Sequence, residues 1–322
     1  DRPLRRPPAR PAIPGRGTEV GSPGRGRLIA GFLLLTVIWG TTWAAIRIGL
    51  EGVPPFTGVS LRFALAGTVL LALARPLGVR LGRGRHERVL WVVNGLLSFC
   101  LSYAAVYWSE QYIPSGLAAV LFATYPLFVA ALAHFLLPGE RLAPIAVAGM
   151  ALGFAGVAVI FSDDLALLGG ETVRTAALVM LVSPVVSAVA SVVVKRWGGD
   201  VHPLSLAAVP MLIAGVVMGA VALLVEQHRP LVFDARSVGA LLYLALLGSA
   251  VTFTIYYWLL ARVKATQVAL MSYLIPIVAV AVGALLFDEP LRPRLLAGSA
   301  LVLAGVVLVS RRRHAPPEVE QP

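Results

Sequence analysis

The sequence predicts an all-α integral membrane protein in which ten transmembrane helices form two inverted five-helix repeats around a central cavity. Three observations lead to this fold class. Hydrophobic residues make up 58% of the 322 residues and charged residues only 13%, whereas a soluble chain is about 45–50% apolar and about 25% charged. The charges are clustered, so that long stretches contain none. The chain also repeats part of its own sequence in its second half.

Ten segments are long and apolar enough to cross a membrane, for which a helix needs about 20 residues. Strands are not expected, because these segments are continuously apolar and do not alternate with a period of two. Arg62 is the one charged residue in the second segment. The predicted spans are 28–46, 55–74, 89–109, 111–139, 142–162, 175–194, 203–225, 237–261, 265–287 and 295–310.

The distribution of positive charge predicts the orientation. If the N-terminus is cytoplasmic, the cytoplasmic segments carry 20 Lys and Arg residues and the outer segments carry 6. Cytoplasmic loops retain positive charge, so we expect a multi-pass protein of the bacterial inner (plasma) membrane with both termini in the cytoplasm. Residues 1–27, rich in Arg, Pro and Gly, are expected to be a disordered basic tail, and 311–322 a second cytoplasmic tail. The net charge of +11 therefore reflects topology, and no nucleic-acid partner is expected.

The two halves of the sequence match each other. Glu140–Phe161 and Glu289–Ser310 share ten identical residues at an offset of 149, and Tyr107-Trp108 matches Tyr257-Trp258 at an offset of 150. Arg47 falls opposite Lys195 at an offset of 148. We therefore expect a first repeat over 28–161 and a second over 175–310, each with five spans. Because five is odd, the second repeat must be inverted, an architecture common among secondary transporters.

Several motifs resemble those of a known family. Trp39-Gly40, then Arg47, Pro54-Pro55 and Arg62-Phe63 resemble the opening of an EamA-type repeat, and Ser115–Ala119 and Gly139–Leu142 continue the likeness. The second half is similar but more divergent, because Ser183-Pro184 stands where the first half has Trp39-Gly40. The resemblance covers residues 28–310 and is to the EamA-like transporters of the drug/metabolite transporter superfamily. It implies ten helices around a central cavity and the transport of small metabolites across the membrane, with export of amino acids or related compounds by alternating access.

A second class of function stays open at this point, namely a membrane enzyme or lipid-handling protein that uses the cavity. The sequence favours a non-enzyme, because it contains no phosphate-binding Gly-Lys-Ser/Thr loop, no His-Glu-x-x-His motif and no Gly-x-Ser-x-Gly elbow. No cofactor and no metal site are expected. The expected partners are a small-molecule substrate and the lipid bilayer, and glycines in the fifth and tenth spans allow either a monomer or a homodimer.

Two charged residues are candidates for substrate binding or coupling. Arg62, near the middle of a span, should face the protein interior, where it could attract a substrate carboxylate or a proton-linked acid. The alternative is a cation neutralised by helix-end carbonyl groups or reaching the membrane surface. Glu110 lies at a short junction and could couple transport to protons if it is buried. The alternative is a carboxylate in a solvated loop.

Neutral side chains complete the candidate site. Tyr103 and Tyr107 lie four residues apart and hence on one helix face; with Tyr256 they could line the cavity, although buried structural tyrosines or an interfacial belt would show the same pattern. Pro126 and Pro276 are expected to kink their spans. Polar residues inside apolar spans could contact substrate or only bond neighbouring helices. These residues are Thr41, Thr42, Asn94, Ser187 and Ser191.

Overall fold

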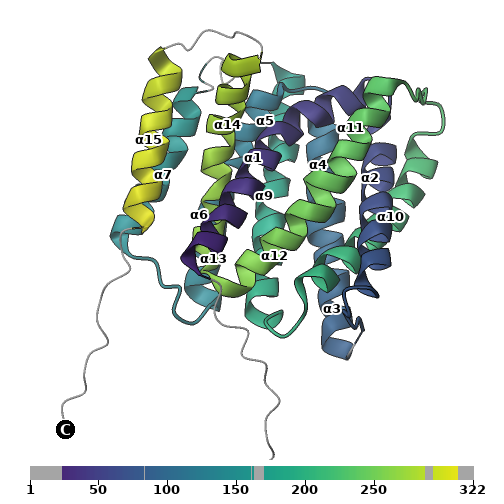
Figure 1. Cartoon of the computed structure of the whole chain (residues 1–322). Helices are drawn as coiled ribbons and strands as arrows, with labels where there is room; N and C mark the ends of the chain where they lie inside the picture. Colours follow the sequence, from purple (N-terminus) through teal and green to yellow (C-terminus); the bar gives the residue numbers. More distant parts are fainter. Residues whose placement is uncertain (1–23, 83, 161, 163–169, 287–292, 311–322) are drawn as a thin grey trace, which may run out of the picture.

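The computed structural model describes residues 24–82, 84–160, 162, 170–286 and 293–310 (Figure 1). Within these ranges the chain forms helices and no β-strand. The expected tails lie almost wholly outside the described residues, although the first helix already begins at Arg25, three residues before the predicted span. The all-α membrane fold class is confirmed by this arrangement.

The helices of the first half follow the predicted spans with a few breaks. The third span is two α-helices joined by a π-helical segment, and the fourth is broken near its middle. The elements are α1 (Arg25–Leu50), α2 (Pro55–Ala74), α3 (Arg85–Asn94), η1 (Gly95–Leu101), α4 (Ser102–Ser109), α5 (Ser115–Phe122), α6 (Tyr125–Leu136) and α7 (Pro144–Ile160).

The second half has the same order of elements, including a π-helical segment in its third span and a break in its fourth. The elements are α9 (Glu171–Trp197), α10 (Pro203–Val225), α11 (Ala235–Ala245), η3 (Leu246–Val251), α12 (Thr252–Arg262), α13 (Ala265–Ala269), α14 (Met271–Leu286) and α15 (Pro293–Ser310). Within the described residues, seven helical stretches are long and apolar enough to span a membrane, and three shorter apolar helices account for the remaining predicted spans.

The helices form a single bundle whose outer edges are pairs of helices from different halves. Helix α7 packs against α15 at one edge and α2 against α10 at the other, while α1, α4, α9 and α12 lie between them (Figure 1). Helix α1 begins and α15 ends at the same face of the bundle (Figure 1). This is the arrangement expected for an even number of membrane crossings.

Glycines allow the close approach of α7 and α15. A Cβ atom on Gly156 would lie 2.6 Å from the carbonyl oxygen of Gly298, and one on Gly149 would lie 2.8 Å from that of Gly305. Side chains essentially never approach a backbone so closely, so these positions admit only glycine unless the helices separate. Small residues are the usual means of packing membrane helices, where no hydrophobic force draws them together.

The two prolines expected to kink helices lie close to the breaks in their spans. Pro126 stands in the first turn of α6, where the missing N–H group would have no partner in the helix, so the chain is interrupted just before it. Pro276 lies inside α14, and the break between α13 and α14 precedes it at Leu270. Proline thus accompanies a helix break in both halves.

Candidate substrate cavity

A cavity of about 90 Å³ lies at the centre of the bundle. Its lining residues come equally from the two halves of the chain. The first half contributes α1, η1, α4, α5 and α6, and the second half contributes α9, α12 and α14. Among the described residues, those that line it include no Asp, Glu, Lys, Arg or His. The wall can therefore offer a bound molecule apolar contact and neutral hydrogen-bonding groups, but no full charge.

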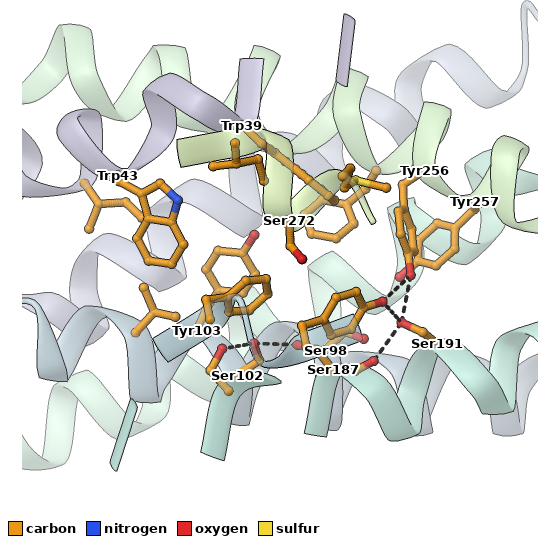
Figure 2. Close-up of a pocket in the computed structure, with 18 residues that line it drawn as sticks. Trp39, Trp43, Ser98, Ser102, Tyr103, Ser187, Ser191, Tyr256, Tyr257 and Ser272 are labelled. Carbon is orange, nitrogen blue, oxygen red and sulfur yellow. Dashed lines mark hydrogen bonds between the residues drawn. The ribbon is translucent and has the colours of Figure 1, made fainter. Parts of the chain in front are cut away.

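The walls differ in chemistry. Trp39 and Trp43 of α1 border one side, whereas serines from η1, α4 and α9 border the opposite side (Figure 2). The indole N–H of Trp39 donates to the Thr252 hydroxyl at 3.0 Å, which fixes the ring. One flank thus presents flat apolar surface and the other presents hydroxyl groups.

The serine side is a network of hydroxyl groups that joins two helices. The hydroxyl oxygens of Ser102 and Ser183 lie 2.7 Å apart, and Ser187 donates to Ser102 at 2.9 Å. These bonds tie α4 to α9. A hydroxyl both donates and accepts, so each member can exchange a bond within the network for one with a ligand.

A second hydroxyl cluster lies further along α9 (Figure 2). The Tyr125 hydroxyl lies 2.7 Å from that of Tyr256 and 2.8 Å from that of Ser191, and Tyr256 donates to Ser191 at 2.8 Å. Tyr125 belongs to the first half, whereas Tyr256 and Ser191 belong to the second. The cluster therefore joins the two halves at the cavity.

Arg62 lies behind the cavity wall, where the side chain is 1% exposed. Its guanidinium carbon is 4.7 Å from the centre of the Tyr103 ring, which itself borders the cavity. A cation over an aromatic ring is attracted by the negative face of that ring. The expectation that Arg62 faces the interior is confirmed, but the Tyr103 ring separates it from the cavity. In this state Arg62 does not line the cavity.

The π-helical segment η3 supplies two of the three hydrogen-bond acceptors of Arg62. The Nη2 atom donates to the Gly248 carbonyl oxygen at 3.0 Å and Nε to the Ser249 hydroxyl at 2.8 Å, while Nη1 donates to the Tyr107 hydroxyl at 3.2 Å. A π-helical turn shifts carbonyl groups out of the usual ladder, and such turns are frequent at functional sites. The segment η1, which occupies the same place in the first half, contributes Ser98 to the cavity.

Four of the candidates chosen from the sequence border the cavity, namely Tyr103, Ser187, Ser191 and Tyr256. Thr41 and Thr42 instead bond the carbonyl groups of the preceding turn, and Thr41 also contacts the Tyr243 hydroxyl. Thr41 thus bonds a neighbouring helix, as the alternative interpretation expected, whereas Thr42 bonds its own helix.

Three further candidates are buried away from the cavity. Asn94 bonds the Tyr257 hydroxyl at 2.7 Å and the Leu206 carbonyl at 2.9 Å. The Tyr107 hydroxyl accepts a hydrogen bond from Arg62. Glu110 is 1% exposed, so it is not a carboxylate in a solvated loop, and neither of its carboxylate oxygens has a hydrogen-bond partner in the described part of the chain.

The sequence reasoning missed several residues of the cavity wall. The missed residues include Trp39 and Trp43, four residues apart on α1, and Ser183, which precedes the candidates Ser187 and Ser191 at the same spacing on α9. Residues at this spacing share one helix face. A polar stripe on an otherwise apolar span is therefore the signal that could have identified the inward face of α9.

The contacts of two cationic side chains show which positions of the two halves are equivalent. Arg47 donates from Nη1 to the carbonyl oxygens of Glu110 and Ile113 at 3.3 and 3.4 Å. Lys195 donates from Nζ to the carbonyl oxygens of Leu260 and Val263 at 2.8 and 2.9 Å. Both pairs of acceptors are related by the offset of 150.

This correspondence corrects one detail of the sequence comparison. Arg47 and Lys195 are related by an offset of 148, which places Ser187, one helical turn after Ser183, opposite Trp39. By the same offset Ser191 stands opposite Trp43. The different chemistry of the two cavity flanks therefore arises at equivalent positions of α1 and α9.

Comparison with known proteins identifies the family. A sequence profile of the EamA-like transporter family matches residues 27–162 and again 174–311. The chain belongs to the EamA-like transporter family. This EamA-like transporter is 33% identical over 283 residues to a protein of Streptantibioticus cattleyicolor described as a probable terminal-alkyne amino-acid exporter, a match that covers 87% of this chain and 92% of the relative. The expected resemblance is confirmed, and the chain is a multi-pass membrane transporter.

Other relatives of this EamA-like transporter are also described as transporters. It is 30% identical over 293 residues to the inner membrane transporter YedA of Escherichia coli (strain K12), with 90% of this chain and 92% of the relative covered. A solved crystal structure superposes with a TM-score of 0.75 at 22% identity, covering 89% of this chain and 97% of the other. That likeness supports the fold.

Proposed function

We propose that this chain is a secondary transporter of the bacterial inner membrane that exports amino acids or related small metabolites by alternating access. The single observation that carries the proposal is the central cavity, whose lining residues come equally from the two halves. A site at the interface of two repeats is the usual place for a substrate in such transporters, because one half can rock against the other around it. We further propose that 28–161 and 175–310 are the two inverted repeats and that both ends of the chain are cytoplasmic.

The cavity chemistry supports a small solute with both apolar and polar groups. Indole rings on one flank can pack against hydrocarbon, and the hydroxyls on the other can bond a polar head group. A cavity of about 90 Å³ is smaller than the roughly 150 Å³ cavity that admits benzene in an engineered protein. A larger solute therefore requires the walls to move apart, as they do when a transporter opens to one side. The relative described as an amino-acid exporter is consistent with this class of solute.

Counterflow tests the proposal. The purified chain is reconstituted in liposomes that are preloaded with one unlabelled amino acid, and entry of the same labelled compound is measured for alanine, threonine, leucine, phenylalanine and propargylglycine. Accumulation of unmodified label above its equilibrium level supports the transporter and gives its substrate class. Absence of counterflow for every compound, from protein shown to be folded, would refute the amino-acid substrate class. A chemically changed product would instead indicate an enzyme.

A cavity-filling variant ties the activity to the proposed site. Ser187→Trp places in the second half the side chain that stands at the equivalent position of the first, and the cavity has no room for both indoles. We expect counterflow to fall at least tenfold. Thr68→Trp adds the same ring at an exposed position of α2 and should leave counterflow unchanged. Equal rates in both variants would contradict the assignment of the cavity.

A further inference from the structure

Arg62 and Glu110 are buried charged residues of the first half that have no charged equivalent in the second. The offset of 148 places Pro210 opposite Arg62, and the offset of 150 places Leu260 opposite Glu110. Leu260 still supplies its backbone carbonyl to Lys195, as Glu110 does to Arg47. The same contact at the helix end therefore forms in the second half, where the side chain is a leucine. The architecture does not require a carboxylate at position 110.

Glu110 differs from the other buried carboxylates of the described residues. Glu140 and Glu226 each accept hydrogen bonds from two backbone N–H groups, and Glu87 accepts one from the Ser205 hydroxyl. Both carboxylate oxygens of Glu110 are buried without a hydrogen bond. An ionised carboxylate in such a place is strongly unfavourable, whereas the neutral acid is tolerated. The described conformation is therefore suited to a protonated Glu110.

The charged groups around Glu110 come from neighbouring helices. Arg47 of α1 and Arg62 of α2 both exert a favourable charge interaction on it, without a direct ion pair in this conformation. The Tyr107 side chain, one turn earlier along α4, accepts a hydrogen bond from Arg62. A small movement of α4 relative to α1 or α2 could bring the carboxylate into contact with either guanidinium group.

Among the described residues, Glu226 is the other buried carboxylate at this end of the bundle, and it accepts hydrogen bonds from the Phe56 and Thr57 backbone N–H groups. Helix α9 packs against α4 where the Ser109 hydroxyl bonds the Ala176 carbonyl, and the ionisable residues Glu171 and Arg174 at the start of α9 are exposed. Helix α5 contains no ionisable residue. Arg229 reaches the next residue, Gln111, and is itself exposed. Within the described part of the chain, Glu110 is thus the buried carboxyl at this end of the bundle whose oxygens accept no hydrogen bond.

The position of Glu110 connects it to the cavity. Its backbone N–H donates to the Val106 carbonyl at 2.9 Å, and Val106 lines the cavity. The carboxyl group thus lies one helical turn beyond the cavity, about 5–6 Å along α4. Any displacement of α4 that opens the cavity must also move Glu110 relative to Arg47 and Arg62.

We propose that Glu110 is a proton-binding site that couples solute movement to the proton gradient. In the conformation described here the carboxyl is the neutral acid; in the opposite conformation it releases its proton to water and the carboxylate pairs with Arg62 or Arg47. The proton thus crosses as the bundle changes state, and no other reactant is required. This inference rests on the proposed transport function.

Infrared difference spectroscopy tests proton binding without any substrate. The purified full chain, in detergent, is brought from about pH 6.5, where ordinary carboxyl groups with pKa values of about 4 are already ionised, to alkaline pH, and the carbonyl band of protonated carboxyl groups is followed. We expect wild type to lose such a band as the pH rises. Glu110→Gln should lack the band, Glu110→Asp should retain a shifted one, and Glu51→Gln, which removes an exposed carboxylate, should behave as wild type. A band that persists in Glu110→Gln would overturn the assignment.

Proteoliposomes test coupling with the labelled amino acid that gives the strongest counterflow. We expect a pH gradient to drive its accumulation in wild type and in Glu51→Gln, and to drive at least tenfold less in Glu110→Gln, with partial recovery in Glu110→Asp. Gradient-driven accumulation that survives in Glu110→Gln would refute the coupling role. Wild type without counterflow would refute the transport proposal and coupling with it, whereas the infrared result would still decide whether Glu110 binds a proton.

Discussion

The carboxylate of Glu140 caps the N-terminus of α13, the helix that starts at Ala265. Its Oε1 atom accepts a hydrogen bond from the Ala265 backbone N–H at 2.9 Å, and Oε2 accepts from the backbone N–H and the hydroxyl of Thr266, both at 3.2 Å. Glu140 belongs to the first half and α13 to the second. One side chain thus both caps a helix and joins the halves.

Removal of this cap should destabilise the protein. In Glu140→Ala the first N–H groups of α13 lose their acceptor while remaining buried, so we expect the free energy of unfolding to fall by about 1–2 kcal/mol. Thermal unfolding in detergent would measure the effect. Glu51→Ala is the matched control, because its ion pair with Arg236 is exposed and contributes little. Equal midpoints for the two variants would show that the cap is not a stabilising contact.

The contact between α7 and α15 should reject any side chain at Gly156. We expect Gly156→Leu to force the helices apart and lower the free energy of unfolding by about 1–3 kcal/mol or more. Gly239→Leu provides the control, because a Cβ atom there has no neighbour within 4 Å. Thermal unfolding of both variants decides the matter: unchanged stability in Gly156→Leu would mean that the close packing of these helices is not required.

The size of the cavity should limit which solutes are carried. Trp43→Ser replaces a large ring by the residue found at the equivalent position, Ser191, and enlarges the cavity on the side of α1. We expect counterflow of phenylalanine to increase relative to that of alanine, while Trp43→Phe should change the ratio little. The control Trp197→Ser removes an indole that is 50% exposed and lies outside the cavity. An unchanged ratio in Trp43→Ser would exclude Trp43 from the determinants of size.

A pH-dependent cap begins α11. The Ser237 backbone N–H donates to the Asp234 carboxylate at 2.7 Å, and this hydrogen bond lowers the pKa of Asp234. Because the folded-state pKa is lower than the unfolded one, the cap stabilises the protein at neutral pH and is lost as the pH falls through the folded value.

The corresponding measurement is thermal unfolding as a function of pH. Asp234→Asn keeps a capping side chain that does not titrate. We expect the stability advantage of wild type over this variant to shrink as the pH falls below the ordinary Asp value of about 3.9. An advantage that grows on acidification would contradict the assigned direction.

The sequence predicted the spans more reliably than the side chains at the centre. Apolar length is a local property, so segments such as 203–225 coincide with the observed helix. The π-helical segments were not predicted, because they depend on which carbonyl groups find partners across the bundle, as the Gly248 carbonyl does with Arg62. The break before Pro126 was expected only as a kink.

For a similar reason, the sequence predicted only part of the candidate site. Helical periodicity groups Tyr103 with Tyr107 but does not say which of them reaches the cavity when the whole face is buried. Tyr103 borders the cavity, whereas Tyr107 bonds Arg62 behind it. Which of the two tyrosines borders the cavity depends on where α2 packs. The sequence of the third span alone does not specify that position.

The pairing of α7 with α15 has a consequence for how the protein is made. Helix α7 is complete at Ile160, but its partner begins at Pro293. At about 5–20 residues per second, a ribosome needs roughly seven to twenty-six seconds to synthesise the chain between them. During that interval the glycine surface of α7 faces lipid or another chain. Final assembly of this edge therefore depends on the last helix to enter the membrane, and a neighbouring unfinished copy could compete for the same surface.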